Sequence, residues 1–178
     1  MNRSASPSLD PLTAATVTTA WVICANKPFY PLYVWWLVGN GVMASLATII
    51  AAPLFAAIPF IARRSPLAAR VALPVVGTLD TLLETKLFGQ AAGTELFLAA
   101  CIMLAALSFH PEEKNWRRAI AVAIFLAFAA FHDRYGAALH VWSAADLATL
   151  FNLNAFAVAS LTVFIALRYA GVARQPPT

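Results

Sequence analysis

Six long apolar segments joined by short loops fill almost the whole of this 178-residue chain. They cover residues 12–39, 41–62, 66–88, 93–109, 116–132 and 147–170, and prolines interrupt the first of them. A helix that crosses a bilayer needs about 20 mostly apolar residues, and backbone exposed to lipid must be hydrogen-bonded within helices. Hydrophobic residues make up 61% of the chain and charged residues only 11%, which is too little polar surface for a soluble globule. We therefore expect an all-α fold, an integral membrane bundle of six transmembrane helices.

The basic residues predict the orientation of this bundle. They gather in alternate connections and at the two chain ends, at Arg3, Arg63, Arg64, Arg70, Lys114, Arg117, Arg118, Arg168 and Arg174. By the positive-inside rule these segments face the cytoplasm, which gives an N-in, C-in topology. The net charge of +4 is therefore explained by topology, and we expect no nucleic-acid partner.

The domain organisation follows from the same pattern. We expect a disordered cytoplasmic tail at residues 1–11, a transmembrane domain at 12–171, and a cytoplasmic tail or linker stub at 172–178. The loops are too short for a soluble catalytic domain, and no phosphate-binding loop, nucleophile elbow or zinc motif occurs. We expect a protein that is not an enzyme by itself.

Ionisable residues within the apolar segments mark the expected functional region, because charge in the bilayer is costly without a partner, water or a proton. Asp80 and Glu84 are four residues apart and share one face of the third segment. Glu84 lies near the outer boundary, while Lys27 lies at a depth similar to that of Asp80, beside Pro28 at the interruption of the first segment. Two interpretations remain open: a buried ion pair that fixes helix register, or a site that binds a ligand or a proton.

A ligand pocket is expected between the first, third, fourth and sixth segments, toward the outer leaflet. An apolar cavity with a few converging polar groups is the usual form of a small-molecule site. The residues that we expect to line it are Lys27, Tyr33, Trp35, Asp80, Glu84, Glu95 and Asn154.

Three stretches carry a family resemblance. The sequence PFYPLYVW at 28–35 resembles the first helix of six-helix sensor domains in quorum-sensing histidine kinases. Residues 77–109, with their Gly-Thr, the turn between Gly89 and Gly93 and the following ELFL, are similar to the six-helix membrane anchors of bacterial class III adenylate cyclases. Asn154 and the later FIALR at 164–168 resemble the last helix of those anchors.

This resemblance implies a multi-pass sensor or receptor of the bacterial inner membrane. It would bind a small hydrophobic or periplasmic signal and pass helix shifts to a cytoplasmic effector, as a homodimer or through a partner. Because no cyclase or kinase sequence follows Thr178, we expect either an excised sensor domain or a stand-alone relative.

Two other functions stay open. Some anchors of this type are thought to bind haem b, and haem needs axial ligands such as histidine. His132 and His140 are the expected ligands of at most one bis-His haem, or of an outer-face metal, because His110 belongs at the opposite membrane face. The other alternative is an accessory subunit whose helices fill a larger membrane complex.

Overall fold

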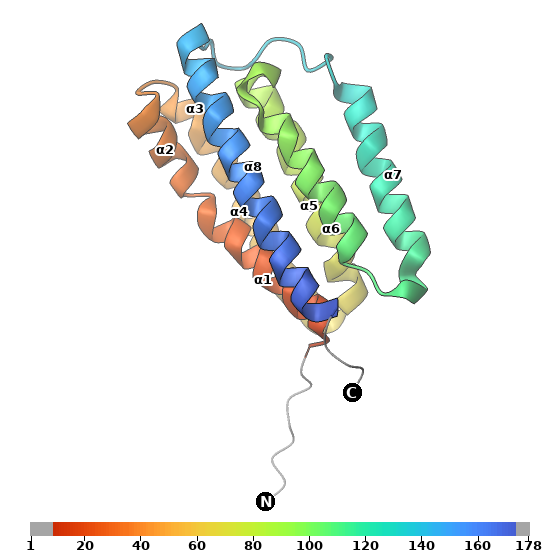
Figure 1. The fold of residues 1–178 in the computed structure, drawn as a ribbon. Coiled ribbons are helices and arrows are strands. Elements are labelled where there is room, and N and C mark those ends of the chain that lie inside the picture. The colour runs from red at the N-terminus through yellow and green to blue at the C-terminus, as the bar shows by residue number, and fades with distance from the viewer. Residues whose placement is uncertain (1–8, 174–178) are drawn as a thin grey trace, which may run out of the picture.

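The computed structural model describes residues 9–173, and its regular elements in this range are all helices (Figure 1). In chain order these are α1 (Pro11–Asn26), α2 (Phe29–Leu37), α3 (Val42–Leu46), the 3₁₀ turn η1 (Ala47–Ala51), α4 (Ala52–Arg64), α5 (Pro66–Phe88), the 3₁₀ turns η2 (Gln90–Ala92) and η3 (Thr94–Leu96), α6 (Phe97–Leu107), the 3₁₀ turn η4 (Pro111–Glu113), α7 (Lys114–Phe131) and α8 (Ala144–Ala173). The all-α class expected from the sequence is confirmed.

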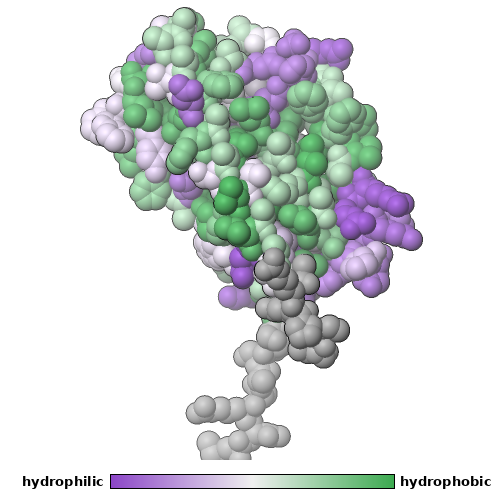
Figure 2. Space-filling view, viewed as in Figure 1, coloured by the Kyte–Doolittle hydropathy of each residue, from purple (hydrophilic) through white to green (hydrophobic). Residues whose placement is uncertain are grey.

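The helices form one bundle in which the chain runs alternately in opposite directions (Figure 1). The start of α1, the α4–α5 and α6–α7 connections and the end of α8 lie at what we call the lower end. The α2–α3 turn, the α5–α6 turns and the α7–α8 loop lie at the upper end. Hydrophobic residues cover most of the face between, while hydrophilic ones gather near both ends of α7 (Figure 2).

Three helical segments are long and apolar enough to cross a membrane, namely Val42–Arg64, Pro66–Phe88 and Ala144–Val172. A fourth crossing results if Thr94–Leu107 and Pro111–Phe131, which are bent by 120° at their junction, are taken as one broken span. The chain is thus suited to a membrane with three or four candidate spans, fewer than the six expected. The difference arises because α1 and α6 are only 16 and 11 residues long and basic residues open α7.

The first helix begins and ends where its local sequence dictates. Asp10 is the N-cap, and its carboxylate accepts a hydrogen bond of 3.0 Å from the backbone N–H of Thr13. Pro11 is the first helical residue, so Asp10 and Pro11 belong to the helix rather than to the disordered tail that we expected. Residues 1–8 and 174–178 of the expected tails lie outside the described residues. At its other end α1 stops at Asn26, because Pro28 has no N–H to continue the helix.

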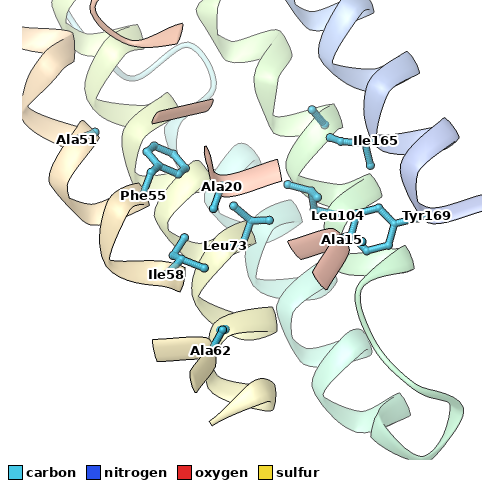
Figure 3. Close-up of a cluster of buried hydrophobic side chains, with 12 residues drawn as sticks. Ala15, Ala20, Ala51, Phe55, Ile58, Ala62, Leu73, Leu104, Ile165 and Tyr169 are labelled. Atoms are coloured by element: carbon cyan, nitrogen blue, oxygen red, sulfur yellow. The ribbon is translucent and has the colours of Figure 1, made fainter. Parts of the chain in front are cut away.

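The core joins α1 to α4, α5, α6 and α8 around small side chains (Figure 3). Ala15 and Ala20 of α1 are fully buried, and Ala20 packs near Phe55 and Leu73. Such residues let helix backbones approach closely, and in lipid this close packing replaces the hydrophobic effect as the force that joins helices. Deeper toward the lower end, the Tyr169 hydroxyl lies 3.0 Å from the hydroxyls of both Thr16 and Ser108, which ties α8 to α1 and α6.

Candidate functional site

Three ionisable side chains meet inside the bundle, and we call them the Lys27 cluster: Lys27, Asp80 and Glu84. The Lys27 ammonium donates a hydrogen bond of 2.7 Å to Glu84 Oε1 and another to Asp80 Oδ2. All three side chains are only 8–10% exposed. The ion pair that was one of the two interpretations of Lys27 and Asp80 is therefore present in the structure, and Glu84 joins it.

The local fold explains why the three groups converge. Lys27 is the residue at which α1 ends, and Pro28 separates it from α2, so its side chain leaves the helix at the break. Asp80 and Glu84 lie one turn apart in the C-terminal half of α5, on one face of that helix. The Lys27 ammonium also lies 5.8 Å from the centre of the Phe55 ring, within the range of a cation–π contact.

The Lys27 cluster is not electrostatically balanced. One ammonium faces two carboxylates, so one negative charge is left uncompensated when all three groups are ionised. A carboxylate at the centre of a membrane costs roughly 2.5–3.5 kcal/mol on insertion scales unless it is compensated. Asp80 Oδ1 is buried and receives no hydrogen bond within the described part of the chain. Such an oxygen remains open to a donor or a cation.

Two more buried polar side chains lie on α2 and α8. Asn154 is fully buried, and its amide nitrogen donates a hydrogen bond of 2.8 Å to the carbonyl oxygen of Ala92. Its carbonyl oxygen has no partner among the residues described here, and neither does the buried Tyr30 hydroxyl. Tyr30 lies on α2, three residues beyond Lys27. The hydrogen bond of Asn154 is to η2, so its place in the expected pocket stays a prediction, and Tyr30 is a buried polar residue that the sequence pattern does not single out.

The two aromatic residues expected in the pocket lie elsewhere. Tyr33 is 37% exposed and Trp35 is 64% exposed, so both face the outside of the bundle. Pro31 and Val34 are instead the buried residues of α2. The expected lining by Tyr33 and Trp35 is therefore not found, because the break at Pro28 sets the rotation of α2 and turns these side chains outward.

Glu95 belongs to a separate cluster at the upper end. Its Oε2 atom lies 2.9 Å from Nδ1 of His132 and 3.0 Å from Nε2 of Gln90, and its Oε1 atom accepts a bond of 3.2 Å from the Tyr135 hydroxyl. The hydrogen bond to Glu95 raises the pKa of His132 above its ordinary value, and Asp133 adds to the effect. Glu95 therefore holds the α7 end to the α5–α6 connection and does not line the Lys27 cluster.

The two histidines expected to share a haem or metal have different partners. His132 contacts Glu95 and Gln90, whereas His140 Nε2 lies 3.3 Å from Oδ1 of Asn40 and its ring lies edge-on to Trp142. Within residues 9–173, no three His, Cys, Asp or Glu side chains are arranged to hold a metal ion. Haem binding stays a prediction, with both rings already engaged in contacts to the protein.

A cluster at the lower end, formed by Arg70, Asp10, Thr13 and Glu113, was not predicted from the sequence, in which Arg70 indicates only the membrane topology. Arg70 is 3% exposed, and its guanidinium donates to the Asp10 carboxylate at 3.2 Å, to the Thr13 hydroxyl at 2.7 Å and to Glu113. Partial burial acts to raise the pKa of Asp10, but the Thr13 hydrogen bonds and the Arg70 charge outweigh it and hold that pKa below its usual value. The one clue was that Arg70 lies a full turn inside an otherwise apolar helix start.

Two surface hollows lie away from the Lys27 cluster. One of about 440 Å³ is lined by α4 residues at the lower end, including Arg63 and Arg64, and one of about 120 Å³ lies between α5 and α7.

Comparison of the chain with protein-family models, with curated proteins and with solved structures finds no match.

Proposed function

We propose that this chain is a sensor module of the bacterial inner membrane, with six crossings and both termini in the cytoplasm. A signal acts at the Lys27 cluster, and α1 and α8 carry its effect to the lower end. The observation that supports this most is the Lys27 cluster itself, an incompletely satisfied set of buried charges at a helix break. Groups of this kind inside a membrane are functional sites more often than structural ones.

Six crossings are supported by the way the shorter helices run. α1 and α2 follow one another across the break at Lys27, and together they extend from the lower end to the upper end (Figure 1). α6 and α7 lie side by side and run in opposite directions, which is expected of two spans joined by a hairpin (Figure 1). The basic side chains beside the α4–α5 and α6–α7 connections all belong to the lower end, which favours a cytoplasmic lower end.

The orientation has a direct test with single cysteines in a background lacking Cys24 and Cys101. Glu112→Cys at the lower end should react with a membrane-impermeant thiol reagent only when the cytoplasmic face is exposed. Val141→Cys, which replaces a residue 92% exposed in the upper α7–α8 loop, should react in intact cells. Labelling of both positions from the same face would contradict the six-crossing topology.

Helix α1 connects the Lys27 cluster to the lower end of the bundle. Lys27 terminates α1, and the same helix contributes Thr16 to the hydrogen bonds around Tyr169 of α8. Tyr169 also bonds Ser108 at the end of α6, so three helices meet in one polar contact near the lower end. A change in how Lys27 is held between the two carboxylates would shift α1 along its axis, and such helix shifts are a common form of signalling.

The partner that receives the signal is proposed from the same geometry. α8 runs to Ala173 at the lower end, which the proposed topology places in the cytoplasm, so its C-terminal turns are positioned to contact a cytoplasmic effector or a second copy of the chain. Its side chain at Leu167 is 71% exposed and free to meet lipid or a neighbouring helix. The resemblance of the first and last segments to sensor anchors agrees with this assignment.

Distances between α4 and α8 at the lower end test the proposal. Spin labels at Arg64→Cys and Ala170→Cys report on the spacing of these helices in lipid nanodiscs, in the same cysteine-free background. We expect Asp80→Asn and Glu84→Gln to change the distance distribution, and Glu95→Gln, which alters a carboxylate outside the Lys27 cluster, to leave it unchanged. Identical distributions in all of these proteins would refute the sensor function.

A further inference from the structure

We propose that the ligand of the Lys27 cluster is a proton, held by the Asp80–Glu84 pair in addition to the hydrogens of the Lys27 ammonium. This inference deepens the proposed function, on which it rests, because it names the chemical class of ligand at the same site. It makes the cluster a site whose charge changes when one proton binds or leaves.

The first reason to expect a bound proton is the charge balance of the cluster. With Lys27 as an ammonium and both acids ionised, the buried region would hold an excess negative charge, since one cation cannot neutralise two anions. Among the described residues, both acids form salt bridges to Lys27 alone. The titratable groups of α2 and α6 that interact with them, the Tyr30 hydroxyl and the Cys101 thiol, are uncharged. One added proton makes the region neutral, which is the favoured state in an apolar surrounding.

The second reason is the oxygen atom Oδ1 of Asp80, which could hold the proton. Lys27 occupies Oδ2 of Asp80 and Oε1 of Glu84, while Asp80 Oδ1 is buried without a partner among the described residues. A proton on this oxygen would convert an unsatisfied buried acceptor into a donor. The cluster therefore offers a place for the proton.

The contacts favour a proton over a metal ion. Metal cations need several oxygen ligands around one point, and here the ammonium already fills the space between the carboxylates with hydrogen-bonded contacts. That same positive charge repels a second cation. A proton needs no additional volume, so it binds without separating α1 from α5. Its loss would leave an anion that draws Lys27 closer to one or both acids.

Infrared spectroscopy of the full chain in lipid nanodiscs tests the inference directly. At neutral pH we expect the carbonyl stretching band of a buried carboxylic acid, and we expect it to disappear reversibly at alkaline pH. Asp80→Asn or Glu84→Gln should remove the band, because either variant leaves one acid paired with Lys27. Glu95→Gln should keep it. Spectra without an acid band, or a band that only Glu95→Gln removes, would overturn the inference.

Two further measurements keep the test decisive. If a variant does not fold, selective ¹³C labelling of aspartate or of glutamate carboxyls in the unaltered chain must shift the acid band, and a band that shifts with neither label contradicts the inference. If added Na⁺ at constant pH removes the band, a metal cation displaces the proton, and the inferred preference of the site for a proton over a metal ion is wrong. A proton band together with unchanged α4–α8 distances would uphold proton binding and refute the sensor function, so the two proposals fail separately.

Discussion

Replacement of Lys27 by methionine is the sharpest perturbation of the buried cluster. The substitution keeps a chain of similar length but removes the ammonium that donates to Asp80 and Glu84. Both acids are then buried without a cation, one helical turn apart. Removing one partner of a buried ion pair costs about 3–5 kcal/mol, and the 8–10% exposure of these side chains leaves little water to reduce that cost. We expect Lys27→Met to lower the free energy of unfolding by about this amount.

The assay is equilibrium unfolding in mixed micelles with increasing dodecyl sulfate. Lys114→Met is the matched control, because Lys114 is exposed at the lower end and surface substitutions usually change stability by less than about 0.5 kcal/mol. Combining Lys27→Met with Asp80→Asn and Glu84→Gln removes all three charges and should recover most of the loss. The reasoning fails if Lys27→Met behaves like the control, or if the losses in the combined variant simply add.

Two further predictions concern the upper end. Gly41 has φ of +66° and an added Cβ would lie 2.1 Å from the Trp142 ring, whereas Gly39 has φ of +81° with open space around it. Gly39→Ala should therefore cost only the backbone strain of about 1–2 kcal/mol, and Gly41→Ala clearly more, as measured by the same unfolding assay; equal losses would contradict the packing at Trp142. In the cluster around Glu95, NMR titration should show that Glu95→Gln moves the pKa of His132 back toward 6.5. Because the pKa of His132 is raised in the folded state, the stability that its contact with Glu95 contributes is fully present below the ordinary histidine pKa. This contribution is lost as the pH rises through the raised pKa of the folded protein. An unchanged His132 titration in Glu95→Gln would refute the pairing.

The sequence predicts the Lys27 cluster because its signals are local. Asp80 and Glu84 share a helical face by spacing alone, and Pro28 requires the first segment to break next to Lys27. Counting residues from the ends of two apolar segments then places Lys27 and Asp80 at comparable depth, with Glu84 one turn nearer the outer boundary. Their contact in the structure follows from one additional condition, that the first and third segments are neighbours.

Other parts of the site depend on information that spacing does not contain. The rotation of α2 after the break decides that Val34 is buried and Trp35 exposed, and a run of mostly apolar residues gives no periodic signal for it. Arg70 reaches Asp10 and Glu113, which are 60 and 43 residues away, so its burial depends on the packing of α1, α5 and η4. Basic charge near a loop predicted only topology there.

The number of membrane spans is also difficult to predict from residue spacing alone. Residues 93–109 read as one apolar segment, but Gly93 and the η3 turn occupy its start, so α6 itself begins at Phe97. Helix length depends on where 3₁₀ turns replace α-helix, which composition does not reveal. The sequence predicted the bundle class correctly, and the crossings still need the labelling experiment.

The most direct test of the central claim measures the contact on which it depends. Solid-state NMR of the full chain in lipid bilayers can detect dipolar coupling between ¹⁵Nζ of lysine and the ¹³C carboxyl carbons of aspartate and glutamate, with the Lys27 signal assigned by its loss in Lys27→Arg. We expect strong coupling of Lys27 to both Asp80 and Glu84, as the hydrogen bonds to Asp80 Oδ2 and Glu84 Oε1 require. A Lys27 signal without coupling to either carboxylate would show that the charges do not meet, and the proposed site would be contradicted.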